Sequence, residues 1–556
     1  MNKVTRRESV IWLVGATTLA ATKSKGQNNN NTTRLFQHGV ASGDPARDSV
    51  VLWTRVTTPT EEMTIAWELA RDPSFKSIVR RGTTSSRAVR DHTVKVVPEG
   101  LEPGQTYYYR FRAQGESSPP GRTKTLPVGA LDRLGIALMS CSNYSLGYFT
   151  TYDAVAADTN IDFVLHTGDY IYEYSNDTSK MSNYYVRPSE PPHQTVTLDD
   201  YRKRHATNKT DPHSQRMHAT HPMIAFWDDH DVANDDWSGG AENHHPATEG
   251  DWRVRRDAAI QAYFEWMPIR DPAPGHSPLD YWRTYSFGDL ATLVTLETRL
   301  TARGKQVDYH EFKDTVHTPA DRAAFMKNVL GDPSRQMMSD GMKTSLKEGL
   351  AASVAQHQPW RLVGNGVLMA KICTPDLRRH GLRPEDYPEL ALLDKYAGIL
   401  WDADHNVPDT TDNWNGYSGA REEFYEICQS VGVRDLLVLT GDSHCFWSNT
   451  LADDQGSAMG IELGTAGISI PSDFALAGFR PALMEKLDKL YASNNVEVNW
   501  TDSRHRGYVR VLLGRESAAV DFVAIDTTIQ QNYSSTILRS ETIHLRDGTL
   551  KSSASA

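Results

Sequence analysis

The stretch IDFVLHTGDYIYEY, residues 161–174, gives the strongest indication of the fold. A short apolar run is followed at once by HTGD at 166–169. Such a run is typical of a buried strand, and α/β proteins carry their chemistry at the carboxyl ends of strands. Two more apolar runs end in DDHD at 228–231 and GDSH at 441–444. The sequence therefore predicts an α/β domain whose strand ends deliver Asp and His to one rim.

Asp and His clustered at strand ends are typical of a metal site, because the ligands must converge from rigid elements. The three carboxylates at 228–231 would repel one another unless cations neutralised them. Taken alone, that motif is also compatible with a solvated acidic loop, and one Gly-Asp turn at 168–169 is a weak signal. The occurrence of three such clusters favours the metal site.

The regions on either side of these motifs predict further organisation. Residues 31–126 contain short β-type runs separated by Asp-Pro and Pro-Gly turns, which indicates an immunoglobulin- or fibronectin-like β-sandwich. From residue 131 onward strands alternate with helices. We therefore expect a catalytic domain over 131–546, followed by a polar tail at 547–556.

The composition describes a folded globular protein. Hydrophobic residues make up 39% and charged residues 23% of the chain, which excludes a disordered or fibrous protein. The 556 residues are too many for one ordinary hydrophobic core, so we expect at least two domains. A net charge of −11 disfavours nonspecific nucleic-acid binding, and no nucleic-acid partner is expected. Four scattered cysteines are too few for a disulfide framework.

The first 30 residues predict an export signal and a linker. Arg6 and Arg7 precede an apolar stretch at 10–21, which is shorter than the roughly 20 residues that span a bilayer. The adjacent arginines are similar to the twin-arginine signature. We therefore expect export by the twin-arginine machinery to the periplasm or the extracellular space, with no stable membrane anchor. An ordinary secretory signal is the alternative.

Longer motifs along nearly the whole chain resemble the PhoD-type alkaline phosphatases, a family of the calcineurin-like metallophosphoesterase superfamily. They include VASGDP at 40–45, VLWTR at 51–55, GDYIYEY at 168–174, FWDDHDVAND at 226–235 and LTGDSHCFW at 439–447. The resemblance implies an N-terminal β-sandwich beside a four-layer α/β/β/α catalytic domain.

The resemblance also implies an exported enzyme that hydrolyses phosphate esters and releases inorganic phosphate. The expected reaction is in-line attack by metal-activated water, hydroxide or an oxo group. A phosphodiesterase, including a phospholipase D-like hydrolase of phospholipids, is an alternative within the enzyme class. A non-enzymatic exported binding module is the alternative outside it.

The family's positions further imply a set of site residues. Its metal-ligand positions are occupied by Cys141, Asp169, Tyr172, Asp229, Asn234, Asp442 and His444, and its catalytic His position by His230. A tyrosine becomes an anionic ligand only beside a strong Lewis acid. This mixture of thiolate, phenolate, carboxylate and amide donors indicates one ferric iron with one or two calcium ions rather than a zinc pair.

Some positions depart from the family's pattern or have an ordinary structural reading. Asp231, Asp235 and Asn415 differ from the residues usual there, which leaves the number of calcium ions open. Inert packing is the alternative for Cys141 and for Tyr172 in its aromatic-rich stretch. Arg202 and His205 either reach the phosphate or cap a helix, and we favour the helix.

Overall fold

Three short parallel strands form the middle of a ten-stranded sheet, and they end at the motifs described above. The computed structural model describes residues 35–176, 184–391, 399–546 and 548–554, so the expected export signal at 1–30 lies outside the described residues. The three strands are β9 (Arg133–Met139), β10 (Phe163–His166) and β11 (Met223–Ala225). β10 and β11 are buried along their whole length, as expected of parallel strands that are covered on both faces.

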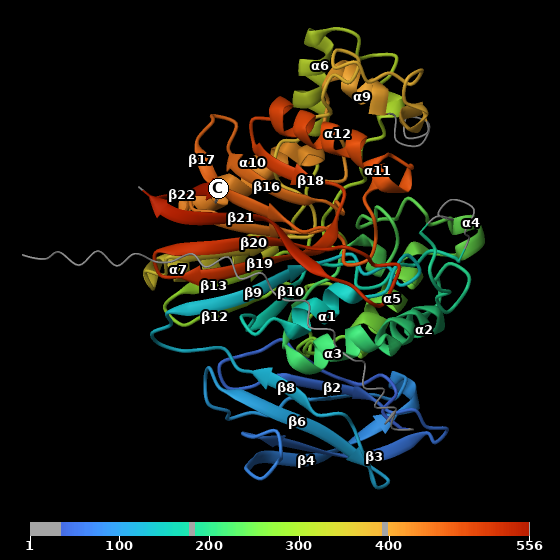
Figure 1. Cartoon of the computed structure of the whole chain (residues 1–556), viewed down its shortest axis with the longest axis vertical. Helices are drawn as coiled ribbons and strands as arrows, with labels where there is room; N and C mark the ends of the chain where they lie inside the picture. The colour runs from blue at the N-terminus through green and yellow to red at the C-terminus, as the bar shows by residue number, and fades with distance from the viewer. Residues whose placement is uncertain (1–34, 177–183, 392–398, 547, 555–556) are drawn as a thin grey trace, which may run out of the picture. The chain divides into compact units, whose positions relative to one another are not determined.

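C-terminal strands extend this sheet on one side and N-terminal strands extend it on the other (Figure 1). The C-terminal strands run antiparallel, and next to β9 they are β19 (Arg506–Gly514), β20 (Ser517–Ile525), β21 (Ser535–Arg546) and β22 (Thr549–Ala554). Next to β11 come β1 (Val40–Gly43), β2 (Val51–Arg55) and β5 (Thr93–Val96). The sheet therefore joins segments from both ends of the described chain.

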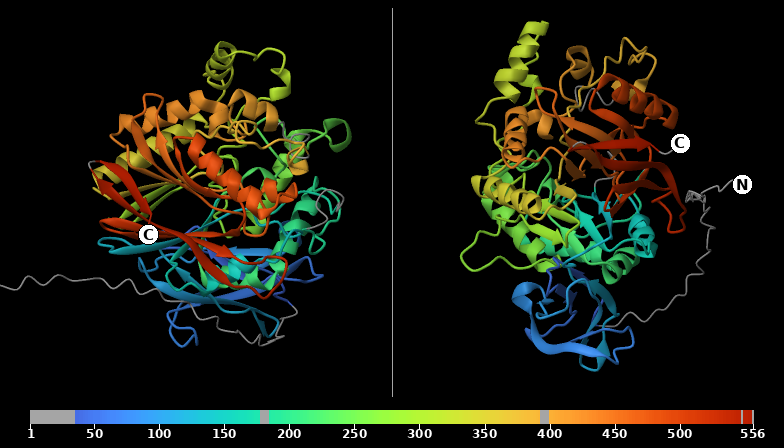
Figure 2. Two further views of the ribbon diagram at one scale, coloured as in Figure 1. Left: turned by 45° about the horizontal axis from the view of Figure 1, so that its top comes forward. Right: turned by 90° about the vertical axis from the view of Figure 1, so that its left-hand side faces the viewer.

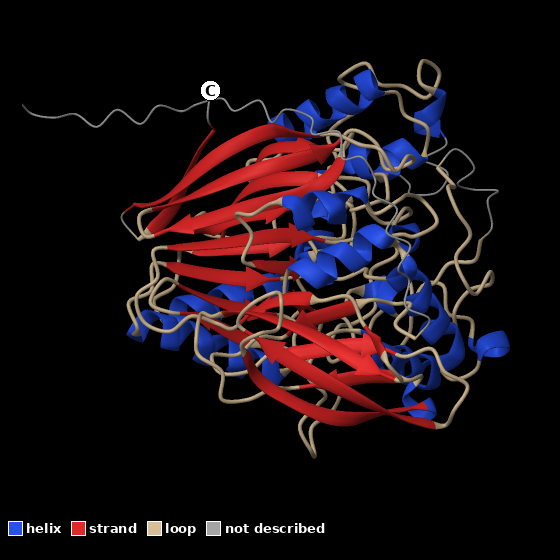
Figure 3. Cartoon of the chain, turned by 60° about the horizontal axis from the view of Figure 1, so that its bottom comes forward, coloured by secondary structure: helices blue, strands red, loops and turns tan. Residues whose placement is uncertain are grey.

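A second sheet of seven strands packs against the first. Its order is β12 (Thr284–Phe287), β13 (Ala291–Thr295), β14 (Trp360–Gly364), β15 (Leu436–Thr440), β17 (Ala458–Gly464), β16 (Phe446–Ala452) and β18 (Val498–Asp502). Leu138 and Leu165 of the first sheet share one hydrophobic core with Leu293 and Leu439 of the second. Figure 3 shows the strands stacked next to one another, with helices beside them.

Helices cover the outer faces of the two sheets (Figure 2, left). The first sheet is covered by α1 (Thr150–Ala157), α2 (Leu198–Thr210), α3 (Pro212–Thr220) and α5 (Trp252–Trp266), and the second by α7 (Asp340–Ala355) and α10 (Ser418–Ser430). Further helices are α4 (Pro246–Glu249), α6 (Pro319–Phe325), α9 (Ile399–His405), α11 (Asp473–Leu476) and α12 (Pro481–Asn494). The layers confirm the predicted α/β/β/α architecture.

A bilayer-spanning helix is absent from the part of the chain that the structure describes.

The N-terminal region forms the predicted β-sandwich. A separate sheet contains β3 (Glu62–Ala70), β4 (Ile78–Arg87), β6 (Thr106–Ala113), β7 (Glu116–Ser117) and β8 (Gly121–Lys124). Its inward side chains, such as Ile65 and Tyr109, share a core with Val40, Leu52 and Val94 of β1, β2 and β5.

One sheet of the sandwich crosses the boundary that we expected at residues 126–131. β1 pairs in parallel with β11 at Gly43 and Met223, and the Asp44 amide donates to the Met223 carbonyl at 2.9 Å. A Cβ atom at Gly43 would lie only 2.4 Å from that carbonyl, so the close approach of the two backbones requires glycine. The sandwich is therefore attached to the catalytic region by backbone pairing as well as by side-chain packing.

The C-terminal residues expected to be a polar tail include strand β22. β22 pairs antiparallel with β21 from Thr549 to Ala554, and Leu550, its one large apolar residue, is buried. Hydrogen bonding to the edge of β21 gives these polar residues a regular structure that their composition does not indicate.

Candidate metal centre

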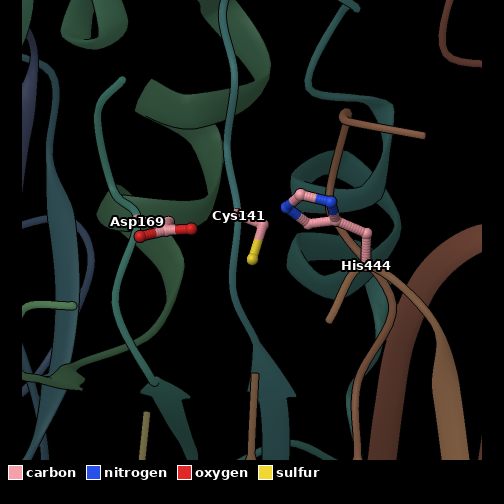
Figure 4. Close-up of side chains that lie close together, drawn as sticks. All are labelled: Cys141, Asp169 and His444. Atoms are coloured by element: carbon pink, nitrogen blue, oxygen red, sulfur yellow. The ribbon is translucent and has the colours of Figure 1, made fainter. Parts of the chain in front are cut away.

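The predicted ligands lie together beyond the strand ends. Cys141 follows β9, Asp169 follows β10, and His444 follows β15 of the second sheet. One potential ligand atom from each of these three side chains lies within 4.8 Å of the others. Figure 4 shows their side chains close together. The two stacked sheets thus bring residues from three separate parts of the sequence to one place.

Two further groups adjoin the first one. Asp169, Asp229 and His230 form the second group, and Asp228, Asp229 and Asp442 form the third. Asp169 belongs to the first and second groups, and Asp229 to the second and third. The three groups therefore form one continuous set of ligand atoms, which we call the acidic cluster: Cys141, Asp169, Asp228, Asp229, His230, Asp442 and His444.

Tyr172 and Asn234 have different relations to this cluster. The Tyr172 hydroxyl donates to Asp169 Oδ2 at 3.0 Å and lies 3.2 Å from Nε2 of His444, so it belongs with the first group. Asn234 lines the same cavity as Asp229 and His230. Its side-chain oxygen accepts a hydrogen bond from the Tyr174 hydroxyl at 2.7 Å.

The backbone is strained where it presents several of these side chains. Cys141, Asp169, Asp442 and His444 have φ values of 65°, 57°, 62° and 56°, in the left-handed region that residues other than glycine seldom adopt. Each such residue costs about 1–3 kcal/mol, and residues of this kind cluster at functional sites. The strain turns the side chains of three strand ends toward one point.

The acidic cluster is electrostatically unfavourable without a cation. Burial, reinforced by neighbouring carboxylates, raises the pKa of Asp169 and of Asp442 well above the usual range. Burial and the charge of Asp169 likewise raise the pKa of the Cys141 thiol. Among the described residues, Oδ1 of Asp169 and Oδ1 of Asp229 are buried without a hydrogen-bond donor. These orphaned oxygens, with the thiol, phenol and imidazole beside them, fit bound metal ions.

Arg299 is a member of the site that the sequence analysis did not identify. Its buried guanidinium lies 2.6 Å from Asp228, 2.8 Å from Asp412 and 3.5 Å from Asp229. The side chain thus compensates part of the negative charge from behind the cluster. Arg299 follows β13, 71 residues from Asp228 and 113 residues from Asp412, and no local pattern indicates the pairing.

Glu173 was also missed, although it lies inside the motif GDYIYEY. Its buried carboxylate is 2.8 Å from Nδ1 of His230 and accepts the backbone amide of Asn234 at 2.7 Å. Burial opposes a charge on His230, but Glu173, Asp229 and Asp169 outweigh it and raise the pKa of this histidine well above its usual value. Because Nδ1 is held by Glu173, Nε2 is the nitrogen that remains for the cavity.

Asp231 organises the backbone around the cluster. Its carboxylate accepts hydrogen bonds from the amides of Asp169 at 2.9 Å, Tyr170 at 3.1 Å and Asp228 at 3.1 Å. Asp231 thereby holds the loops after β10 and β11 together.

A cavity of about 360 Å³ opens onto the acidic cluster. Asp229, His230, Asp442 and His444 line it on the cluster side. Its lining contains further Asp residues, whereas neither Lys nor Arg occurs among the lining residues within the described ranges. An anionic substrate would therefore meet negative charge unless cations were bound.

A second buried polar cluster, which we call the histidine cluster, contains His166, His205, His218 and Lys209. The His218 imidazole contacts the Lys209 amine and the Tyr170 hydroxyl, each at 2.9 Å. Burial lowers the pKa of His166 and of His205 to about 3, and lowers that of Lys209 strongly. His205 packs within the fold, and Arg202 pairs with Glu265 at 2.7 Å. Neither residue lines the cavity, and both lie inside α2, which Thr197 rather than either of them caps.

Comparisons with known proteins point to one family. The model of the PhoD-like phosphatase family matches residues 136–522, and the model of the PhoD-like phosphatase N-terminal domain matches residues 20–127. The chain is 32% identical over 440 residues to alkaline phosphatase D of Bacillus subtilis (strain 168), covering 76% of this chain and 67% of that relative. A solved structure of PhoD superimposes with a TM-score of 0.77 and 27% identity, covering 95% of this chain and 94% of the other.

Proposed function

Since this chain belongs to the PhoD-like phosphatase family and is therefore a phosphoric ester hydrolase, we propose that it hydrolyses phosphate esters by metal-assisted in-line attack of water. Inorganic phosphate is the product when the substrate is a monoester. The observation that carries the proposal is the acidic cluster, in which Asp169 and Asp229 have buried oxygens that lack a donor in the described chain.

We assign the ligands to two kinds of metal ion. Cys141, Asp169, Tyr172 and His444 would hold a ferric iron, because thiolate and phenolate donors suit a strong Lewis acid. Asp229, Asn234 and Asp442 would hold one or two calcium ions, which prefer oxygen donors. When bound, such ions polarise phosphoryl oxygens, offset their charge and lower the pKa of water.

The protein's own residues orient the reaction. Glu173 fixes the His230 ring through Nδ1, so that Nε2 is available to hold or transfer a proton at a phosphate oxygen. Arg299 pairs with the Asp228 carboxylate, Asp231 accepts the backbone amide of Asp169, and neither residue lines the cavity. We therefore assign the catalytic contact to His230 and positioning roles to the other three residues.

The cavity favours a second candidate within the enzyme class, a phosphodiesterase that also accepts phospholipid-like substrates. A monoester carries up to two negative charges at phosphate, whereas a diester carries one. A lining rich in Asp, with neither Lys nor Arg among its described members, disfavours the more highly charged substrate.

We also infer twin-arginine export from residues 1–30. The test is secretion of a reporter fused to this segment, compared with the same fusion carrying Arg6→Lys/Arg7→Lys.

Hydrolysis and metal content test the main proposal together. Protein purified with iron and calcium should hydrolyse p-nitrophenyl phosphate, bis(p-nitrophenyl) phosphate or both, and elemental analysis should find both metals. The ratio of the two rates decides between monoesterase and diesterase. A protein that retains both metals yet hydrolyses neither ester would instead support a binding module.

A further inference from the structure

Part of the cavity wall is formed by helices that carry no predicted metal ligand. Asp402 of α9, Asp409 beyond it, Asp473 of α11 and Asp488 of α12 all line the cavity. We call these four residues, with the aromatic residues beside them, the distal wall. The three helices share a hydrophobic core that includes Ile399, Ala475 and Leu487, so this wall is a built part of the fold.

Three carboxyl groups of the distal wall have little or no compensating positive charge in the described chain. In the described parts of the chain, neither Asp409 nor Asp473 forms an ion pair with Lys or Arg, and Asp488 has only Arg504, at 4.0 Å. Burial raises the pKa of Asp409 and that of Asp488 to about 7. A cation bound here would favour the ionised form of both carboxyl groups.

Aromatic side chains adjoin these carboxylates. The ring of Tyr491 lies 6.2 Å from that of Phe474 and 6.3 Å from that of Trp447, and all three residues line the cavity. Aromatic faces beside carboxylates are the surroundings that bind substituted ammonium groups, through cation–π attraction and charge.

A buried hydroxyl without a hydrogen-bond partner is an independent feature of the same wall. Thr501 lines the cavity opposite Trp447 on the paired strand, and it is 5% exposed. Its hydroxyl is buried and has no hydrogen-bond partner within the described residues. A buried hydroxyl is seldom left unpaired, so its presence in the wall suggests a polar group of a ligand.

The distal wall begins beside the acidic cluster. Asp473 of the distal wall and His444 of the acidic cluster line the same cavity. An ester whose phosphate lies at the cluster would extend its alcohol along the wall. Resting on the proposed function, we propose that the distal wall binds an ammonium-bearing alcohol, so that the enzyme selects phosphate esters of amino alcohols.

A pair of isosteric esters tests this specificity. p-Nitrophenyl phosphocholine and p-nitrophenyl 3,3-dimethylbutyl phosphate have the same shape and differ in one atom, a cationic nitrogen against a neutral carbon. We expect kcat/KM to be about tenfold higher for the choline ester. In the variant Asp409→Asn/Asp473→Asn that ratio should fall to about one, while kcat/KM for the dimethylbutyl ester changes less than about twofold.

Asp404→Asn is the matched control, because Asp404 lies on the same helix as Asp402 but pairs with Arg378 and does not line the cavity. This control should keep the wild-type ratio. A wild-type ratio near one, or a ratio that the double variant leaves unchanged, would overturn the proposal. Hydrolysis of the dimethylbutyl ester reports on the proposed function separately.

A binding measurement tests the ammonium specificity of the distal wall even if the enzyme hydrolyses neither ester. Calorimetry should show that phosphocholine binds about tenfold more tightly than 3,3-dimethylbutyl phosphate, and equal affinities would refute the assignment. Vesicles of phosphatidylcholine distinguish the source of the alcohol. Their hydrolysis would support a lipid headgroup, and selective hydrolysis of the soluble ester alone would support a water-soluble one.

Discussion

The acidic cluster and the histidine cluster are both buried sets of titratable side chains, and the motif HTGD contributes to each. His166 belongs to the histidine cluster, and Asp169, three residues later, belongs to the acidic cluster. In the histidine cluster burial favours the neutral forms, so imidazoles and an amine can pack without counter-ions. In the acidic cluster the carboxylates lie beside a cavity and retain oxygens that the described chain does not satisfy.

The contrast teaches that burial of titratable groups alone does not mark a functional site. The histidine cluster contains unpaired ring nitrogens as well, but aromatic rings surround it and it does not line the cavity. The acidic cluster combines burial with backbone strain, like charges and access to a cavity. That combination is typical of a site built for a ligand.

Of the substitutions in the two clusters, Asp169→Asn should have the largest effect on metal content and activity. We expect loss of metal and a decrease in kcat/KM of at least about a thousandfold, because the residue joins two ligand groups. Elemental analysis and ester hydrolysis measure both quantities. Asp199→Asn, at an exposed position of α2, is the control. If the Asp169→Asn protein kept its iron and its activity, the acidic cluster would not be the catalytic metal site.

Replacing Tyr172 by Phe should have the next largest effect. If Tyr172 binds ferric iron, the protein should show visible absorbance that this variant loses, with a decrease in kcat of about a hundredfold. Tyr174→Phe is a matched control, because its hydroxyl contacts Asn234 rather than Asp169. An identical spectrum in Tyr172→Phe and the wild type would exclude the phenolate ligand.

Glu173→Gln should separate positioning from metal binding. The amide cannot hold His230 as the carboxylate does, so kcat should fall about 10–100-fold while both metals remain. Metal analysis and kcat, compared with those of the exposed control Glu190→Gln, provide the measurement. If metal content falls in parallel with kcat, Glu173 supports the ligands rather than the histidine.

His205→Phe should leave activity unchanged and alter only acid stability. The folded-state pKa of about 3 lies below the usual 6.5, so the unfolded chain binds the proton first and stability is lost as pH falls through this range. Relative to wild type, the variant should gain about 2 kcal/mol in free energy of unfolding between pH 7 and pH 5. Urea denaturation at both pH values measures this gain, and no gain is expected for the exposed control His310→Phe.

The strand ends could be predicted from the sequence because they depend on local pattern. Short apolar runs followed by Asp and His locate Asp169, Asp229 and Asp442 correctly at the ends of β10, β11 and β15. Cys141 and Tyr172 required the family resemblance, since a lone thiol and one tyrosine among several carry no signal of their own. The structure places both beside Asp169.

Other features depend on tertiary approach and left no local pattern. Arg299 meets Asp228 only because two different sheets stack, and the join between β1 and β11 depends on a glycine at one crossing point. β22 is a strand through pairing with β21, since its composition is that of a polar tail. Arg299 and β1 have partners that are distant in the sequence, and β22 has no apolar periodicity. Neither property leaves a local pattern from which the structure could be predicted.

The pairing of β9 with β19 has a consequence for the order of events during synthesis. β9 ends at Met139, but its partner strand is not complete until Gly514 has been made. The last ligands of the acidic cluster, Asp442 and His444, also come from the final quarter of the chain. Translation adds about 5–20 residues per second, so tens of seconds separate the synthesis of β9 from that of β19. The site is therefore assembled only near the end of synthesis, and metal loading must follow it.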